Sequence, residues 1–366
     1  MATKPEKKTK RSPLTIALTG DVMLGRLMNE AIRLNGPRYP WGDTLDLLRQ
    51  ADLTIINLEC VIATNGKPWT RTPKVFHFRA DPQAIEVLEI AGVDYVSLAN
   101  NHTLDFEEDA LLEMLRRLDE AGIAHAGAGR NLDEARRPAW LKAKGRTIAV
   151  VSFTDNEPAW AATDKSPGVN FVPVNRRARQ FSALKDTVRR AREDGADLVI
   201  ASAHWGPNMR QRPTAAFEAF AHELMDAGTD VFHGHSAHIF QGIEIYKGKP
   251  ILYDTGDFVD DYAVDEVFRN DQSALFRLQL DSAGIRHIDV FPVLIKDFQA
   301  RLAKGRDFQE ISNRMQRSCE EMGTKVERHE RHLRIQTSSK KGARIGSTDQ
   351  IGSTDSPGYP RCSCLG

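Results

Sequence analysis

The segment VDYVSLANNHTLDFEEDALLEMLRRLDEAG, residues 93–122, decides the fold class of this protein. Its first part is a short apolar run bounded by polar residues, which is typical of a buried strand. A polar loop follows, and the remainder spaces its apolar residues three and four apart, as an amphipathic helix does. Gly122 stands where such a helix usually ends. The segment therefore predicts a strand, a polar loop and a helix in succession.

The same alternation extends over most of the chain. Buried strands are predicted at LTIALTG, ADLTIINLE, TIAVVSF and ADLVIASAHWG. Amphipathic helices are predicted at DPQAIEVLEIAG and VNRRARQFSALKDTVRRAREDG, and both end at a glycine. Strands that alternate with helices indicate an α/β fold. The later segments GIEIYKGKPILYDTG and SALFRLQLDSAGIRHIDVFPVLI each have the pattern of two strands around a tight turn, so antiparallel strands are expected after the α/β part.

Composition places the chain among ordinary globular proteins. Of its 366 residues, 41% are hydrophobic and 27% are charged, and 50 Lys and Arg residues balance 50 Asp and Glu residues. Net charge therefore gives no reason to expect a nucleic-acid partner. Four cysteines are too few for a disulfide framework, and the sequence has neither a signal peptide nor a run of about 18 apolar residues. We expect a cytoplasmic protein with no transmembrane segment, and peripheral attachment to a membrane stays open.

The chain divides by composition into an organised region and two tails. Residues 1–12 are basic, and we expect them to be flexible. Residues 13–302 contain the predicted strands and helices and would form the main domain. A C-terminal helical extension is expected over residues 303–336, where DFQEISNRMQRSCEEMG has helical spacing. Residues 337–366 are rich in Ser, Gly and Lys, contain IGSTD twice, and are predicted to be disordered.

Polar side chains with metal-binding chemistry follow five of the predicted strands. Loops after strand ends are where α/β proteins place ligands and catalytic groups. FHGHSAH, residues 232–238, is the densest of these loops, with three histidines between two apolar runs. The candidate residues of the five loops are Asp21; Asn57 and Glu59; Asn100, Asn101, His102 and Asp105; His204; and His233, His235 and His238. Carboxylate, amide and imidazole groups without a thiolate form a mixed oxygen and nitrogen ligand set, which suits Mn, Fe or Zn.

Each candidate also has a purely structural interpretation. Asp21 could cap a helix that begins just after it, and Glu59 could be a surface residue. Residues 100–102 could form a turn, because Asn tolerates the left-handed backbone conformation. His204 could be a core residue. Five loops with the same chemistry are much less expected by chance than any one of them, so a metal site is the favoured interpretation.

Taken together, the motifs resemble those of the CapA family, also called the poly-gamma-glutamate capsule biosynthesis family. The resemblance is carried by GDVMLGR, NLE, NNHTLDF, HWG, GHSAHIFQGIE and YDTGDF, with AHAGAGRNLDEARRP between them, and it covers most of residues 13–302. That family is related in fold to the calcineurin-like metallophosphoesterases. The resemblance implies a four-layer α/β/β/α fold, a metallophosphatase-like sandwich of two mixed sheets with helices outside.

The resemblance also implies roles for single residues. The metal ligands would be Asp21, Glu59, Asn101, His204, His235 and His238. His102 would be a catalytic acid or hydrogen-bond donor, and Asp105 would orient it. Arg26 would bind an anionic substrate or, alternatively, lie in solvent on a helix. Met23 stands where metallophosphoesterases have a histidine, so one or two divalent ions are expected. His233 is left out of the set, because its side chain points opposite to that of His235 if the strand continues.

Two functions fit this site. The first is a metal-dependent hydrolase that acts on a phosphoester or gamma-glutamyl bond of an anionic small molecule or polymer. The second is a non-catalytic accessory protein that binds poly-gamma-glutamate or its synthase complex. The retained site chemistry favours the hydrolase, whereas Met23 and the association with capsule assembly favour the accessory protein.

Overall fold

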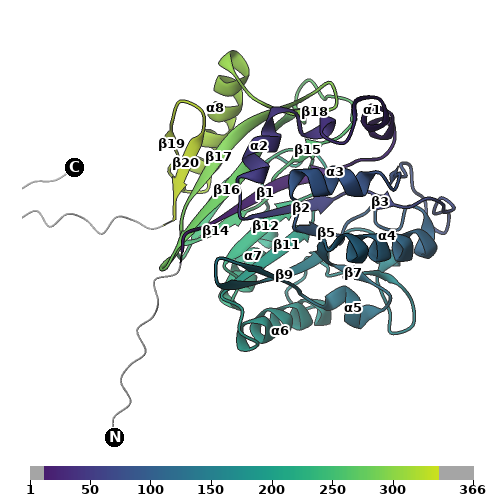
Figure 1. The fold of residues 1–366 in the computed structure, drawn as a ribbon. Helices are drawn as coiled ribbons and strands as arrows, with labels where there is room; N and C mark the ends of the chain where they lie inside the picture. The colour runs from purple at the N-terminus through teal and green to yellow at the C-terminus, as the bar shows by residue number, and fades with distance from the viewer. Residues whose placement is uncertain (1–11, 338–366) are drawn as a thin grey trace, which may run out of the picture.

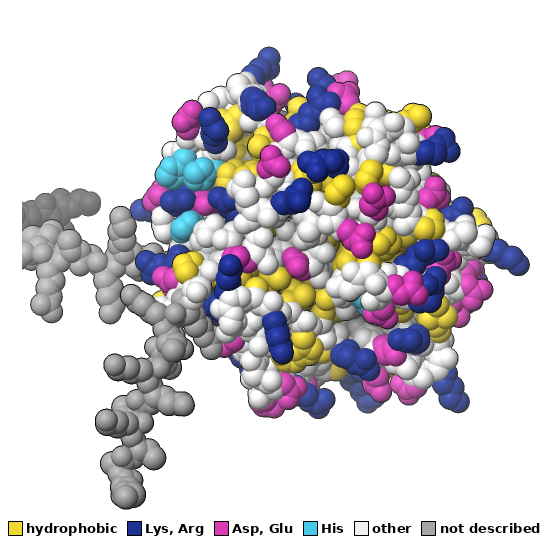
Figure 2. All heavy atoms as spheres, in the orientation of Figure 1, with side chains coloured by type: hydrophobic (Ala, Val, Ile, Leu, Met, Phe, Trp, Pro, Cys, Tyr) yellow, Lys and Arg dark blue, Asp and Glu magenta, His cyan; other side chains and the backbone are white. Residues whose placement is uncertain are grey.

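Two large β-sheets form the centre of the protein, and helices cover their outer faces (Figure 1). A computed structural model describes residues 12–337. The predictions for the basic N-terminal tail, except at Ser12, and for the C-terminal tail beyond Thr337 concern residues outside this range. Figure 2 shows Lys and Arg side chains interspersed with Asp and Glu side chains over one face, in agreement with the balanced charge of the sequence.

The first sheet has ten strands. They are β1 (Leu14–Val22), β2 (Leu53–Leu58), β5 (Tyr95–Ser97), β6 (Ala124–Ala126), β15 (Asp257–Val259), β16 (Gln272–Asp281), β17 (Gly284–Lys296), β18 (Gln299–Leu302), β19 (Glu327–Arg328) and β20 (Leu333–Gln336). Their order is β19-β20-β17-β16-β1-β2-β5-β6, with β15 beside β1 and β18 beside β17. β1, β2, β5 and β6 run parallel, and β16 and β17 form the predicted antiparallel pair.

The second sheet has six strands. They are β8 (Ala139–Ala143), β9 (Arg146–Thr154), β11 (Leu198–His204), β12 (Val231–His235), β13 (Ile243–Tyr246) and β14 (Lys249–Leu252), in the order β13-β14-β12-β11-β9-β8. β9, β11, β12 and β14 are parallel, while β13 pairs with β14 around the predicted Lys-Gly turn. Two small sheets pair β3 (Val61–Ile62) with β4 (Arg79–Ala80) and β7 (Ala128–Gly129) with β10 (Gly168–Val169).

Helices lie where the sequence predicts them, at residues 84–91, 107–121, 179–193 and 305–321, and four more lie at places for which no helix was predicted. The helices are α1 (Leu27–Asn35), α2 (Leu45–Arg49), α3 (Ala84–Ala91), α4 (Glu107–Ala121), α5 (Leu132–Arg136), α6 (Arg179–Glu193), α7 (Ala215–Asp226) and α8 (Gly305–Glu321), with 3₁₀ turns η1 (Tyr39–Thr44) and η2 (Pro158–Trp160). α3 and α4 end at Gly92 and Gly122, both in the left-handed conformation that glycine adopts without strain.

Three apolar cores separate four layers. Along β1, Ile16 and Leu18 face a core shared with the second sheet, whereas Ala17 faces a core shared with α1 to α4. In the second sheet, Ile200 faces the shared core, and its neighbours in β11 pack beneath α6 and α7. Alternate residues of one strand point to opposite faces, so both faces of each sheet are buried. These contacts confirm the predicted four-layer α/β/β/α fold of two mixed sheets.

The segment after Leu302 joins this architecture. α8 lies where the sequence predicts a helix, but β19 and β20 add strands that the sequence analysis did not predict. β20 pairs antiparallel with β17, and Leu333 and Ile335 are fully buried in the core between the sheets. Across residues 12–337, no helix combines the length and apolar character needed to cross a bilayer.

Candidate metal centre

Both large sheets bring polar side chains to the carboxyl ends of their parallel strands. Asp21 is the second-last residue of β1 and pairs with Asn57 near the end of β2. Glu59 follows the last residue of β2 directly. In the second sheet, His204 ends β11 and His235 ends β12, and the two are paired in register. The helix-cap interpretation of Asp21 is therefore wrong, because the residue lies in a strand.

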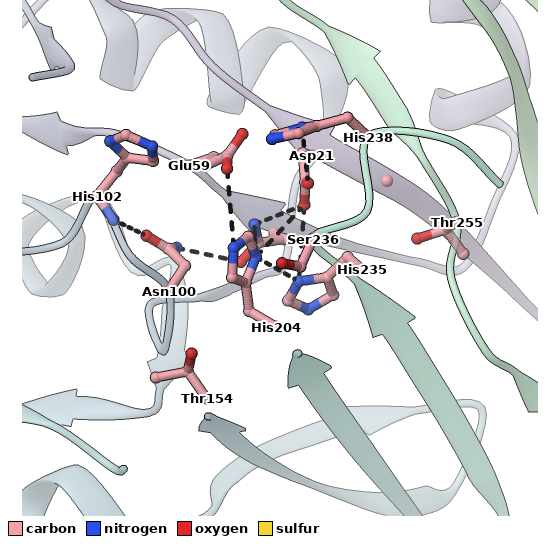
Figure 3. A network of polar contacts seen from close by, with 12 residues as sticks. Asp21, Glu59, Asn100, His102, Thr154, His204, His235, Ser236, His238 and Thr255 are labelled. Atoms are coloured by element: carbon pink, nitrogen blue, oxygen red, sulfur yellow. Dashed lines mark hydrogen bonds and ion pairs between the residues drawn. The ribbon is translucent and has the colours of Figure 1, made fainter. Parts of the chain in front are cut away.

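These side chains form two groups that share Asp21 (Figure 3). The first group is Asp21, His204 and His235, and the second is Asp21, Glu59, His238 and Asp257. Within each group the possible ligand atoms lie within 4.8 Å of one another. Every member is buried, and His238 is the most exposed at 8%. The surface interpretation of Glu59 is therefore also wrong.

The first group joins the two sheets. Asp21 Oδ1 lies 3.8 Å from His204 Nδ1 and 3.6 Å from His235 Nδ1, and the two Nδ1 atoms are 3.0 Å apart. The Asn57 amide donates to Asp21 Oδ1 at 2.8 Å. Because Asn57 Oδ1 in turn accepts a hydrogen bond from Asn100 at 3.2 Å, two amides hold this carboxylate in place.

The second group surrounds the other oxygen of Asp21. His238 Nδ1 lies 3.8 Å from Asp21 Oδ2 and 2.8 Å from Asp257 Oδ1. The Tyr262 hydroxyl donates to Glu59 Oε2 at 2.9 Å. Glu59 Oε1 also lies 3.8 Å from His204 Nε2, so the carboxylate faces both groups.

Close backbone packing creates this arrangement. A Cβ on Gly20 would lie 1.8 Å from the carbonyl oxygen of Gly256, so only glycine lets β1 approach the segment that leads into Asp257. The loop with His238 is held by Asp254, whose Oδ2 accepts from the Ala237 amide at 2.8 Å. His238 itself has a φ of 60°, a conformation that few side-chain-bearing residues adopt. Such strain is typical of functional sites.

The chemistry of the two groups fits a divalent cation. Within the described part of the chain, Asp21 Oδ2, Glu59 Oε1 and Asp257 Oδ2 are buried and accept no hydrogen bond. Buried carboxylate oxygens without a partner are costly, and a bound cation would remove that cost. Imidazole nitrogens complete a ligand set of the kind that Mn, Fe and Zn prefer. The sharing of Asp21 is compatible with one ion or two.

The pKa values show the same excess of buried charge. Burial, with the nearby charges of Glu59 and Asp257, raises the pKa of Asp21 well above its usual value. Burial lowers the pKa values of His204 and His235 well below the usual value, so both rings are neutral and free to act as ligands. Burial opposes protonation of His238, but the carboxylates around it, led by Asp257, hold its pKa well above the usual value.

His102 and Asp105 form a pair beside the centre. His102 Nδ1 lies 2.6 Å from Asp105 Oδ2, and the His102 ring stacks on Phe78 with centroids 3.9 Å apart. The His102 backbone amide donates to Asn100 Oδ1 at 3.0 Å. The Asn100 side-chain amide in turn donates to Asn57, which contacts Asp21 in the first ligand group. Burial lowers the pKa of His102 well below its usual value and raises that of Asp105 to about 7.

Three other sequence candidates lie around these groups. Asn101 has a buried Oδ1 without a hydrogen-bond partner among the described residues, and its role as a ligand stays a prediction. Arg26 lies 3.4 Å from Asp261 Oδ2 and covers the rings of Phe76 and Phe78, which does not test its role in substrate binding. His233 lies in neither ligand group, and its Nε2 is 2.8 Å from the Thr19 carbonyl oxygen.

Asp257 is a candidate ligand that was not predicted from the sequence, whereas Asn57 and Asn100 were among the predicted candidates without their role in supporting Asp21. A signal for Asp257 was present, because the tripeptide Thr-Gly-Asp occurs at residues 19–21 and again at residues 255–257. The two copies lie side by side, with Asp21 paired to Asp257 between β1 and β15. The repeated motif, near the end of β1 and at the start of β15, therefore marked both carboxylates.

Fold and site together define a four-layer α/β/β/α protein with a buried carboxylate and imidazole centre suited to a divalent metal. The chain belongs to the bacterial capsule synthesis protein family PGA_cap, whose profile matches residues 15–262. A probable polyglutamine synthesis accessory protein of Mycobacterium tuberculosis is 32% identical and aligns over 86% of this chain and 93% of its own. The capsule biosynthesis protein CapA of Bacillus anthracis is 29% identical, over 85% and 76% respectively.

Solved structures overlap with this one only loosely. The purple acid phosphatase from yellow lupin has a TM-score of 0.38 and 8% identity over 82% of this chain and 55% of its own. The 5'-nucleotidase of Candida albicans has a TM-score of 0.41 and 9% identity over 85% and 58%. Overlap at this level decides nothing about the chemistry of the present site.

Proposed function

We propose that this capsule-family protein is a metal-dependent hydrolase that acts on a phosphoester or gamma-glutamyl substrate. The observation that carries the proposal is the pair of ligand groups around Asp21, with His102 and Asp105 beside them. Asp21, Glu59, Asp257, His204, His235 and His238 would hold the metal. A bound divalent ion would lower the pKa of a water molecule toward about 7 and polarise the substrate oxygen.

His102 is the proposed proton-transfer residue. When Asp105 is ionised, its Oδ2 accepts the Nδ1–H of His102, which fixes the ring and leaves Nε2 to exchange a proton with the substrate. Stacking on Phe78 restricts the ring further. Arg26, whose guanidinium lies over Phe78, would pair with an anionic group of the substrate.

A second candidate function is a non-catalytic accessory role in poly-gamma-glutamate synthesis. Two observations favour it. The ligand side chains are almost completely buried, which restricts access of a large substrate to a metal ion. In addition, the relative in Mycobacterium tuberculosis is named an accessory protein. In this case the metal would stabilise the junction between the two sheets.

Metal analysis combined with hydrolysis rates separates the two functions. Purified protein would be loaded with Mn²⁺ and assayed on bis(p-nitrophenyl) phosphate and on poly-gamma-glutamate. For a hydrolase, His102→Ala keeps the metal but loses about 10²–10⁴ in turnover, because a proton-transfer group acts only at the chemical step. His235→Ala loses metal and activity together. His222→Ala is the matched control, since this histidine pairs with Glu244 and belongs to neither ligand group.

Two results would contradict the hydrolase. Metal-loaded protein that cleaves neither substrate would favour the accessory function. A His102→Ala variant as active as the unaltered protein would remove His102 from the chemistry, even if the metal centre proved catalytic.

A further inference from the structure

One lysine lies almost completely inside the protein, beside His102 and Asp105. Lys74 belongs to the segment 63–78, which connects β3 to β4 without a helix or strand of its own. Its side chain is only 6% exposed. A buried ammonium group loses its hydration, so it needs partners that stabilise its charge. The partners of Lys74 therefore indicate what this residue does.

Two of the partners of Lys74 come from the loop after β5. Its Nζ donates to the backbone carbonyl of Asn101 and lies 3.4 Å from Asp105 Oδ1. It also lies 3.4 Å from Glu157 Oε1 and 4.8 Å from the centre of the Trp160 ring. Lys74 therefore contacts the loop after β5 both before and after the histidine that this loop carries.

The two carboxylate oxygens of Asp105 face different groups. Oδ2 accepts from the backbone amide of Phe78 at 2.6 Å and lies 2.6 Å from His102 Nδ1. Oδ1 is buried and has no hydrogen-bond partner among the described residues, but the Lys74 ammonium lies close enough to compensate its charge. A buried carboxyl group stays ionised more readily beside an opposite charge. Lys74 therefore favours the ionised form of Asp105.

The ionisation of Asp105 decides which nitrogen of the neutral His102 ring carries the proton. Ionised Asp105 can only accept, so His102 carries its proton on Nδ1, whereas protonated Asp105 donates to Nδ1 and leaves the proton on Nε2. Burial raises the pKa of Asp105 to about 7, and the charge of Lys74 is the largest effect that opposes this rise. The charge of protonated His77 acts in the same direction. The nearby Cys60 thiol is neutral, because burial raises its pKa to about 12.

We infer that Lys74 is a positioning residue, which keeps Asp105 ionised and so holds His102 with its proton on Nδ1 and its Nε2 free. The segment 63–78 then contributes twice to this arrangement, because it also carries Phe78, whose ring stacks on His102. The effect of Lys74 on catalysis rests on the proposed hydrolysis, whereas its effect on the His102 proton does not.

Nitrogen NMR of the full chain, with isotope-labelled histidine and diamagnetic Zn²⁺, reports which nitrogen of His102 carries the proton. The His102→Ala variant identifies the signals of this ring. At about pH 8, where Asp105 with its pKa of about 7 is mostly ionised, the unaltered protein should show the Nδ1–H form. Lys74→Met should shift His102 to the Nε2–H form, because loss of the positive charge raises the pKa of Asp105 further. Lys74→Gln, which can still donate to the Asn101 carbonyl, gives the same test if Lys74→Met does not fold.

Hydrolysis of bis(p-nitrophenyl) phosphate provides a second measurement. At about pH 7, Lys74→Met should keep its metal but lose about tenfold or more in turnover, because a misplaced proton impairs proton transfer. The turnover of the variant relative to the unaltered protein should recover as the pH rises and Asp105 ionises without the lysine. A purely structural defect would not be reversed by higher pH.

Two control variants separate this role from the general effect of a lost ion pair. Lys185→Met removes a lysine on α6 that pairs with Glu223 and lies 4.8 Å from the centre of the Phe181 ring, so it matches Lys74 in its kinds of contact. Glu157→Gln removes the other carboxylate beside Lys74. Both variants should keep the Nδ1–H form of His102 and the unaltered hydrolysis rate.

Three NMR results would overturn the inference: the Nε2–H form of His102 in the unaltered protein, the Nδ1–H form in a folded Lys74→Met variant, or an equal shift in Glu157→Gln. If the unaltered protein cleaves neither substrate, the proposed hydrolysis is wrong, and the NMR comparison still decides whether Lys74 controls the proton on His102.

Discussion

Asp21 is the residue on which the candidate centre depends. Of the side chains in the described part of the chain, it is the member that both ligand groups share. Its Oδ1 faces His204 and His235, while its Oδ2 faces His238. A carboxylate with its two oxygens directed at different groups couples them, so its replacement should affect the whole centre.

Replacement of Asp21 by Asn should therefore lower metal content more than replacement of Asp257 by Asn. Asn keeps the shape of the side chain but removes the negative charge, and Asp257 belongs to only one group. We expect Asp21→Asn to lose nearly all bound metal and Asp257→Asn to lose only part of it, because the group of Asp21, His204 and His235 stays intact in the second variant. Elemental analysis after dialysis against Mn²⁺ buffer measures both.

Asp186→Asn serves as the control for this comparison, because Asp186 pairs only with Arg189 on an exposed helix face. Equal metal contents for Asp21→Asn and the unaltered protein would show that Asp21 is not a ligand.

At the scale of elements, the approach of β1 to β15 positions two carboxylates. Gly20 is essential to it, since a Cβ there would overlap the Gly256 carbonyl. We expect Gly20→Ala to destabilise the fold by about 1–3 kcal/mol, the usual cost of overpacking, and to reduce metal content as β15 is displaced. Chemical denaturation and elemental analysis would show both effects together.

The control at this position is Gly145→Ala. Gly145 has a φ of +71° with no neighbouring atom near its Cβ position, so the variant should cost about 1 kcal/mol of backbone strain alone. Its metal content should equal that of the unaltered protein. A drop in metal for both variants would indicate general destabilisation rather than a specific effect at β1.

The C-terminal strand β20 is a second element whose role can be measured. Leu333 and Ile335 are fully buried against β17 and α8, so each should lose about 2–5 kcal/mol of folding free energy when replaced by Ala. Gln336→Ala, at an exposed position of the same strand, should change stability little. If all three variants unfolded at the same denaturant concentration, β20 would not be part of the main fold, and residues 303–336 would be the separate extension that the sequence predicts.

At the scale of the whole molecule, the candidate metal centre joins the two sheets. Asp21 and Glu59 come from the ten-stranded sheet, and His204 and His235 from the six-stranded sheet. A metal bound to both would stabilise the folded state by about 2.7 kcal/mol at a free concentration 100 times its Kd. We therefore expect EDTA to lower the thermal unfolding temperature by several degrees and added Mn²⁺ to restore it.

The His235→Ala variant is the control for metal removal. It should unfold at the same temperature with and without EDTA, because it has already lost a ligand from the group that joins the sheets. An unaltered protein that is insensitive to EDTA would contradict a metal link between the sheets.

The fold class and most of the strand ends that carry chemistry could be predicted from the amino-acid sequence. Apolar runs and helical spacing are local patterns, so the order of strands and helices could be predicted from residues 13–302 alone. The loops with Asp21, Glu59, His204, His235 and His238 were recognisable because polar residues that bind metals follow buried strands. The structure adds that the side chains of these loops converge, because the possible ligand atoms within each group lie within 4.8 Å of one another.

The division of these side chains into two ligand groups that share Asp21 could not be predicted from the sequence and follows from the three-dimensional structure. It places Asp257 opposite Asp21, it supports Asp21 with Asn57 and Asn100, and it inserts β20 beside β17. These contacts join residues separated by tens to hundreds of positions, and they depend on sheet order and register. A period of two or of 3.6 residues fixes which face of an element is buried, but it contains no information about which element lies on the other side.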